Sequence, residues 1–170
     1  YGVAPDHPEV KSVSSTFMQV AGDPRVRYFG NIEIAGSGPQ AISVAELQKN
    51  YSAIILAYGA SSDRPLNIPG EDLEGVISAR NFVNWYNGHP QFLNGLGINF
   101  DLSEVDEAVI IGQGNVALDC ARILTKSPNE LVQTDISRGA LEALRRSNVK
   151  KVTLVGRRGP VQAAFTIKEL

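Results

Sequence analysis

A glycine turn between two apolar segments constrains the fold of this chain more than any other feature. Residues 112–117 read Gly-Gln-Gly-Asn-Val-Ala, between the strand-like run 108–111 and the helix-like segment 118–124. Such a unit binds the pyrophosphate of a dinucleotide, because the glycines let the backbone approach the phosphates and the helix N-terminus presents N–H groups. The pattern therefore predicts an α/β fold with a dinucleotide site at the turn. The residues of this site would be Gly112, Gln113, Gly114, Asn115 and Val116.

An arginine pair indicates which dinucleotide the turn would bind. The next apolar strand, expected over residues 151–155, is followed by Gly156, Arg157, Arg158 and Gly159. An NAD site has a carboxylate near this position, which accepts from the ribose 2′-OH, whereas an NADP site has arginine for the 2′-phosphate. Arg157 and Arg158 therefore favour NADP(H), with a salt-bridged strand end as the alternative. A partly helical insertion over 127–147 lengthens the crossover, but the sheet still determines where the second strand ends.

Size and composition limit the remaining possibilities. A chain of 170 residues corresponds to one typical domain, or to two small or incomplete ones, and a hydrophobic content of 43% can form a core. The net charge of −2 gives no indication of nucleic-acid binding. Cys120, the single cysteine, excludes an internal disulfide and is expected in the core, and no apolar run is long enough to span a membrane. Because the chain starts at Tyr1 and ends in a helix-like stretch, we expect a piece of a longer protein.

The rest of the chain is expected to alternate short helices and strands. Helices are predicted over residues 9–20, 46–51, 78–86 and 166–170, and strands over 26–29, 31–34 and 51–58. The last of these strands is almost continuously apolar, which is typical of a buried parallel strand, and it stops at Gly59. We expect a domain boundary near residue 63.

A second glycine-rich segment, residues 35–41, resembles a dinucleotide turn but is not interpreted as one. A phosphate-binding turn must open directly into a helix. Here the helix start is later, because Ser43 and Glu46 form a capping-box pattern. The segment is therefore expected to be a surface loop.

Six motifs follow one another along nearly the whole chain. They are YGVAPDHPEVK (1–11), YGA (58–60), IPGE (68–71), WYNG (85–88), GQGNVALD (112–119) and GRRGPVQAAFTIKEL (156–170). Together they resemble the adrenodoxin reductase family of ferredoxin–NADP⁺ reductases, and the combination is far more specific than any single turn.

The resemblance implies a Rossmann-like flavoprotein with two dinucleotide-binding domains, present here only in part. Residues 1–63 would belong to the FAD-binding domain and residues 64–170 to the NADP-binding domain. Electrons would pass from NADPH through FAD to an adrenodoxin-like [2Fe-2S] ferredoxin. The family's FAD pyrophosphate turn, its second FAD segment and much of its ferredoxin-docking surface would lie outside this chain.

The resemblance also implies a location for the parent protein. It places the parent protein in mitochondria, on the matrix side of the inner membrane, where it could associate peripherally; bacterial relatives leave a cytoplasmic location open. No transmembrane segment, nucleic-acid partner or metal ligand of this chain is expected.

Individual residues acquire expected roles from the family. Glu169 would lie near the nicotinamide end of NADP, Ile34 beside the FAD adenine, and Gly59 at a second strand end facing FAD. His7 would lie by the isoalloxazine, with Asp119 as its partner in proton handling, so that His7, Asp119 and Glu169 are the candidate catalytic residues. Without the resemblance, Ile34 would be an ordinary core residue and His7 a loop histidine. Asp119 would be a carboxylate in the first turn of a helix, and Glu169 a glutamate on a helix surface.

Two other functions remain open. An FAD/NADP oxidoreductase like the small subunit of glutamate synthase would commonly carry cysteine-rich iron–sulfur segments, and the single cysteine and Asp6-His7-Pro8 disfavour it. A non-catalytic NADP-binding module would leave the features around Ile34 and Gly59 unexplained.

Overall fold

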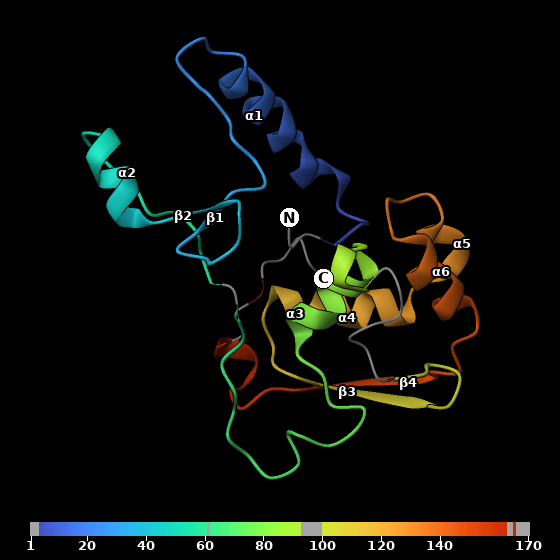
Figure 1. Cartoon of the computed structure of the whole chain (residues 1–170). Helices are drawn as coiled ribbons and strands as arrows, with labels where there is room; N and C mark the ends of the chain where they lie inside the picture. Colours follow the sequence, from blue (N-terminus) through green and yellow to red (C-terminus); the bar gives the residue numbers. More distant parts are fainter. Residues whose placement is uncertain (1–3, 61, 93–99, 163–164, 166–170) are drawn as a thin grey trace. The chain divides into compact units, whose positions relative to one another are not determined.

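The fold is described from a computed structural model, which describes residues 4–60, 62–92, 100–162 and 165 (Figure 1). Contacts within the chain divide it into two compact units. The larger unit combines Tyr1–Val10 with Asp63–Leu170, and the smaller unit comprises Lys11–Ser62. One division lies next to the boundary expected near residue 63, while the first ten residues join the larger unit. The assignment of residues 1–63 to FAD and 64–170 to NADP stays a prediction.

The larger unit contains the expected strand–turn–helix–strand arrangement. Strand β3 (Glu107–Ile111) pairs in parallel with β4 (Lys151–Val155), with Glu107 opposite Lys151 and Ile111 opposite Val155. The crossover runs through helices α4 (Asn115–Thr125), α5 (Pro128–Leu131) and α6 (Arg138–Arg145). The two strands, the helix after the turn and the inserted helical segment are thus confirmed, and the fold of this unit is α/β.

Helices cover one face of the β3–β4 pair. Helix α4 contacts both strands, and α3 (Ala79–Tyr86) packs against α4 and α6 (Figure 1). Side chains along β3 alternate, with Ala108 and Ile110 partly buried and Val109 and Ile111 exposed, as a strand with one covered face requires. Short 3-10 helices lie at η2 (Pro90–Phe92) and η3 (Pro160–Gln162).

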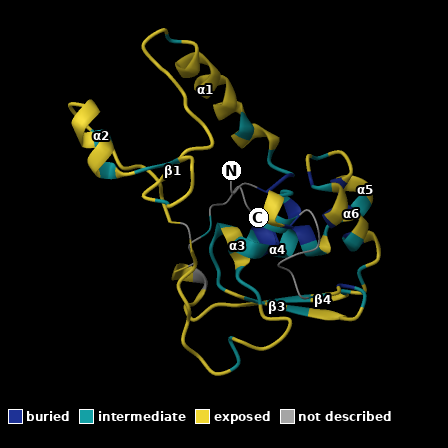
Figure 2. Ribbon diagram, in the orientation of Figure 1, coloured by how far each residue is buried: buried dark blue, intermediate teal, exposed yellow. Residues whose placement is uncertain are grey.

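The core of the larger unit lies among these helices. Figure 2 shows the buried residues gathered around α4. Tyr86, Ile123 and Leu131 are fully buried, and Phe82 meets Tyr86 edge to face with ring centroids 5.6 Å apart. Burying one such side chain contributes about 1.5–3 kcal/mol. Cys120 belongs to the same cluster, as expected from the sequence.

Serine caps determine where several helices start. The Ser78 hydroxyl accepts from the Asn81 N–H at the start of α3, and Ser137 does the same for Ala140 at the start of α6. Each such cap contributes about 1 kcal/mol. The helix predicted over 78–86 is thereby confirmed.

The smaller unit has little regular structure beyond its helices. Helix α1 (Val13–Ala21) follows the 3-10 helix η1 (Pro8–Ser12), and strands β1 (Glu33–Ile34) and β2 (Ala41–Ile42) form a short parallel pair. Helix α2 (Val44–Asn50) begins after β2, and Ser43 accepts from the Glu46 N–H. The glycine-rich segment 35–41 therefore does not open directly into a helix, which confirms that it is not a phosphate-binding turn.

Two predicted strands are not strands in the structure. Residues 26–29 and 51–58 run without strand pairing, and they are largely exposed, with Ile55 reaching 89%. A strand exists only when a neighbour accepts and donates its backbone hydrogen bonds. Within the part of the smaller unit that the structure describes, neither segment has such a neighbour. The helix expected over 166–170 lies outside the described residues.

Candidate functional site

The glycine turn joins β3 to α4 in a conformation that leaves space above it. The Gly112 N–H donates to the Val155 carbonyl at 2.9 Å, and the Gly112 φ of +138° is a conformation that favours glycine. Gly114 precedes α4 with φ −99° and ψ 178°, which any residue can adopt. A Cβ atom at Gly114 would meet no described atom within 4 Å. Gly114 therefore borders open space at the N-terminus of an 11-residue helix.

The arginine pair lies at the same edge of the sheet as the turn. Val155 is opposite Ile111 in the strand register, and Arg157 and Arg158 follow Val155 after one residue. Both arginines are exposed, and neither forms an ion pair with any residue that the structure describes. The alternative of a salt-bridged strand end is therefore not supported within the described ranges.

Gln113 connects the turn to the arginine segment. Its side chain lies where a side chain of Gly156 would be, since a Cβ atom there would overlap Oε1 of Gln113 and lie 2.7 Å from its Cδ. Gly156 does not have a positive φ, so its backbone conformation does not require glycine. Nε2 of Gln113 is buried and has no hydrogen-bond partner in the described structure. Packing over Gly156, rather than a hydrogen bond from Nε2, thus holds this side chain.

These features fit an NADP pyrophosphate and its 2′-phosphate. The space above Gly114 permits close approach of a phosphate, and the helix N-terminus favours negative charge. Guanidinium groups match phosphate oxygens in charge and geometry. The structure therefore brings the predicted turn residues and the predicted arginines to one edge of one sheet.

A buried ionic cluster lies on another face of α4. The Asp6 side chain is only 3% exposed, and it accepts from Arg122 Nε at 2.7 Å and from Lys126 Nζ at 3.1 Å. Burial by itself would raise the pKa of Asp6, but the hydrogen bonds from Arg122 and Lys126 outweigh it, so that this pKa lies below its usual value. Asp6 thereby ties residues 4–10 to α4.

His7 and Asp119 belong to the same cluster. Nε2 of His7 lies 3.7 Å from Oδ1 of Asp119 and 2.6 Å from Nη2 of Arg122, and Nδ1 lies 2.9 Å from Oε1 of Glu9. Arg122 also donates to Oδ1 of Asp119. The two residues predicted to handle protons are thus close together, and Arg122 contacts both.

Sequence reasoning missed Arg122 and Lys126. A signal was present, because Asp119 and Arg122 are three residues apart on one face of α4, and Lys126 directly follows the helix. What faces them, Asp6 and His7, comes from more than 110 positions away in the sequence. No local pattern joins these two segments.

Two buried groups lie beneath the cluster. The Tyr86 hydroxyl has no hydrogen-bond partner in the described structure, and burial raises its pKa, with the negative charge of Asp119 adding to the effect. Burial likewise raises the pKa of the Cys120 thiol to about 11. Both groups are therefore neutral near pH 7.

Ile34 and Gly59, the residues expected near FAD, are accessible and do not pack on each other. Ile34 ends β1 and is 47% exposed. Gly59 has φ +64°, and its Cβ position meets no described atom within 4 Å, so that Ile34 does not pack on it. Glu169 lies outside the described residues.

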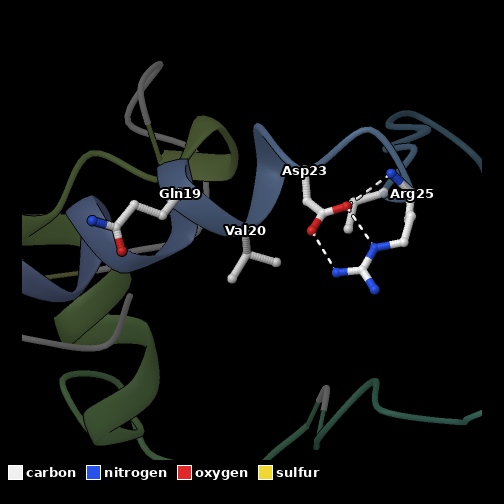
Figure 3. Close-up of a pocket in the computed structure, with 5 residues that line it drawn as sticks. Gln19, Val20, Asp23 and Arg25 are labelled. Atoms are coloured by element: carbon white, nitrogen blue, oxygen red, sulfur yellow. Dashed lines mark hydrogen bonds and ion pairs between the residues drawn. The ribbon is translucent and has the colours of Figure 1, made fainter.

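A hollow in the smaller unit is unrelated to these positions. Gln19, Val20, Asp23, Arg25 and Val26 line it, and Figure 3 shows Asp23 and Arg25 paired with each other. It contains none of the predicted site residues. In the described part of the chain no helix is long and apolar enough to cross a membrane, and no group of three or more His, Cys, Asp or Glu side chains could hold a metal ion.

Comparisons with known proteins identify the family. No protein-family model matches the chain. The chain is 55% identical over 170 residues to the mitochondrial NADPH:adrenodoxin oxidoreductase of Bos taurus, covering 100% of this chain and 33% of that protein. It is 53% identical over 169 residues to the NADPH-ferredoxin reductase FprA of Mycobacterium tuberculosis, covering 99% of this chain and 35% of that protein.

A solved structure gives the same result. That of Mycobacterium tuberculosis FprA in complex with NADPH matches with a TM-score of 0.90 at 53% identity, and covers 99% of this chain and 35% of that one. The chain thus spans about a third of the length of the relatives that it matches. Identity above one half along the whole chain, together with the same fold, confirms the resemblance carried by the six motifs. The chain belongs to the adrenodoxin reductase family of ferredoxin–NADP⁺ reductases, as a segment of about a third of its members' length.

Proposed function

We propose that this chain supplies the NADP-binding site of an oxidoreductase that passes electrons from NADPH through FAD to an adrenodoxin-like [2Fe-2S] ferredoxin. The observation that carries the proposal is the open glycine turn at the same sheet edge as Arg157 and Arg158. The names of the relatives, NADPH:adrenodoxin oxidoreductase and NADPH-ferredoxin reductase, support it. So does the NADPH complex of FprA.

On the NADP side, the turn from Gly112 to Val116 would hold the pyrophosphate through backbone N–H groups and the N-terminus of α4. Arg157 and Arg158 would bind the 2′-phosphate, which NADH lacks. Glu169 would accept from the carboxamide of the nicotinamide, because a carboxylate is an acceptor for such an NH₂ group.

On the flavin side, Ile34 and Gly59 would contact FAD. Bound FAD would supply the chemistry, accepting a hydride from NADPH and releasing single electrons. His7 would hold or move a proton at its Nε2 beside the flavin, with Asp119, 3.7 Å away, stabilising the charged imidazolium. Residues 1–63 would then belong to the FAD domain and 64–170 to the NADP domain.

The electron acceptor and the cellular location of the parent protein are proposed from the names of the relatives. A ferredoxin of the [2Fe-2S] type would accept the electrons. Because several relatives are mitochondrial proteins, we place the parent protein in mitochondria, on the matrix side of the inner membrane. A non-catalytic NADP-binding module remains the alternative.

The test is anaerobic reduction of the flavin in the full-length protein, with NADPH or dithionite as the reductant. In Gly114→Val the new side chain occupies the space above the turn, so we expect NADPH-driven reduction to fall strongly while dithionite still reduces the flavin. Gly139→Val is the matched control, since Gly139 in α6 also borders open space and is not in the turn. Undiminished NADPH-driven reduction in Gly114→Val would refute the site. A full-length protein that binds NADPH but carries no flavin would favour the binding module.

A further inference from the structure

Arg122 is the centre of the ionic cluster on α4. Its Nε donates to Oδ2 of Asp6 at 2.7 Å, and its Nη2 lies 3.3 Å from Oδ1 of Asp6 and also contacts Oδ1 of Asp119 and, at 2.6 Å, Nε2 of His7. The Asp6 carboxylate that holds the guanidinium is nearly inaccessible to solvent, and Lys126 pairs with the same Asp6 oxygen. Because the guanidinium is planar and its donors are fixed relative to one another, holding Nε against Asp6 also sets where Nη2 points.

The contacts of His7 determine which of its ring nitrogens carries the proton. A guanidinium has only donors, so Nε2 of His7 must accept from Arg122 with its lone pair. A carboxylate has only acceptors, so Nδ1, at 2.9 Å from Oε1 of Glu9, must donate. His7 is therefore a neutral imidazole with its proton on Nδ1.

This arrangement leaves no direct hydrogen bond between His7 Nε2 and Asp119 Oδ1. Their atoms Nε2 and Oδ1 are 3.7 Å apart, which is too long for a hydrogen bond, and Arg122 donates to both of them. A proton on Nε2 would point at the Arg122 donor. Arg122 and a proton therefore compete for the same lone pair of His7.

We propose that Arg122 is a positioning residue that holds His7 as the neutral Nδ1–H tautomer and must release Nε2 before His7 can take up a proton there and donate it to Asp119. The tautomer follows from the contacts alone, whereas the proton uptake rests on the proposed function. The charged groups of this cluster among the described contacts include Asp6, Glu9, Asp119, Arg122 and Lys126.

The tautomer can be measured directly by NMR on the full-length protein labelled with ¹⁵N-histidine, at about pH 8, where an ordinary histidine is neutral. His7 is assigned by its loss in His7→Gln. His89 is an internal reference with the opposite expectation, because its Nδ1 accepts from the Gln91 N–H and its proton should be on Nε2. We expect a protonated Nδ1 for His7 and a protonated Nε2 for His89. A proton on Nε2 of His7 would overturn the proposal.

Two variants distinguish the effect of Arg122 on His7 from that of the other charged residues of the cluster. In Arg122→Met, the lone pair of His7 Nε2 loses the donor that competes with a proton, while Nδ1 can still donate to Glu9, so the form with protons on both ring nitrogens should persist to a higher pH than in the wild type. Lys126→Met is the matched control, because it also removes a partner of Asp6 without contacting His7 in the cluster; His7 should keep its proton on Nδ1. Proton uptake on Nε2 of His7 at the same pH in Arg122→Met as in the wild type, or the same change in Lys126→Met, would contradict the inference.

The two claims fail separately. The tautomer is read without NADPH or ferredoxin, and the wild-type spectrum tests it even if Arg122→Met does not fold. A failure of the proposed function would instead appear as a flavin that NADPH does not reduce.

Discussion

Replacing Asp6 by asparagine removes the buried carboxylate that ties residues 4–10 to α4. Removing one partner of a buried ion pair costs about 3–5 kcal/mol. Arg122 keeps Asp119 as a partner, and the Lys126 side chain is 29% exposed and can turn to water. We therefore expect the lower end of the range, about 3 kcal/mol, which is on the order of a hundredfold in the equilibrium for local opening.

Hydrogen–deuterium exchange of residues 4–10 in the full-length protein measures this opening. The pKa of Asp6 is lowered in the folded state, so its contribution is fully present above the unfolded pKa and is lost as pH falls through the folded pKa. The difference between wild type and Asp6→Asn should thus persist at about pH 5 and shrink below about pH 4. Asp23→Asn, which breaks an exposed ion pair with Arg25, is the control and should leave exchange unchanged. Equal protection of residues 4–10 in wild type and Asp6→Asn near pH 7 would refute the reasoning.

Three further predictions follow from packing and burial. Gly156→Ala should displace the Gln113 side chain and weaken NADPH binding about tenfold, with little loss of stability. In a Gln113→Ala background the same substitution should weaken NADPH binding no further, which a double-mutant cycle of NADPH dissociation constants would show. Tyr86→Phe should leave the unfolding free energy unchanged or raise it by up to about 1 kcal/mol, because the hydroxyl has no partner among the described residues; a clear loss in urea unfolding would reveal a partner. Cys120 should react with a thiol reagent near pH 7 only after unfolding, since its thiol is buried and has a pKa of about 11; fast labelling of the native protein would contradict this.

The βαβ part of the fold could be predicted because its signals are local. Residues 108–111 and 151–155 are apolar runs bounded by glycine, and each forms a strand with the other as its neighbour. The run 51–58 carries the same apolar signal but is not a strand, since the described part of its unit offers it no neighbour. An apolar run thus indicates which residues suit burial in a sheet, and leaves open whether a partner strand is available.

The candidate site could be predicted where residues adjacent in sequence act together. The strand–turn–helix–strand pattern of the sequence identifies turn residues 112–116 and the pair Arg157 and Arg158. The strand register places both at one edge of the β3–β4 sheet. Arg122 could not be recognised in this way, because its role depends on Asp6 and His7, which reach α4 only in the folded chain. The contact between Gln113 and Gly156 was likewise hidden, because it depends on where the Gln113 side chain packs and not on the backbone conformation of Gly156.

The most direct test of the central claim compares the dissociation constants of NADPH and NADH for the full-length protein and for Arg157→Ala combined with Arg158→Ala. Each charge-assisted hydrogen bond contributes about 1.5–3 kcal/mol, so the pair should account for a preference for NADPH of about a hundredfold or more. We predict that the double variant loses most of this preference, with NADPH weakened and NADH nearly unchanged. Equal weakening of both nucleotides, or an unchanged preference, would contradict the assignment of this edge of the sheet to the 2′-phosphate.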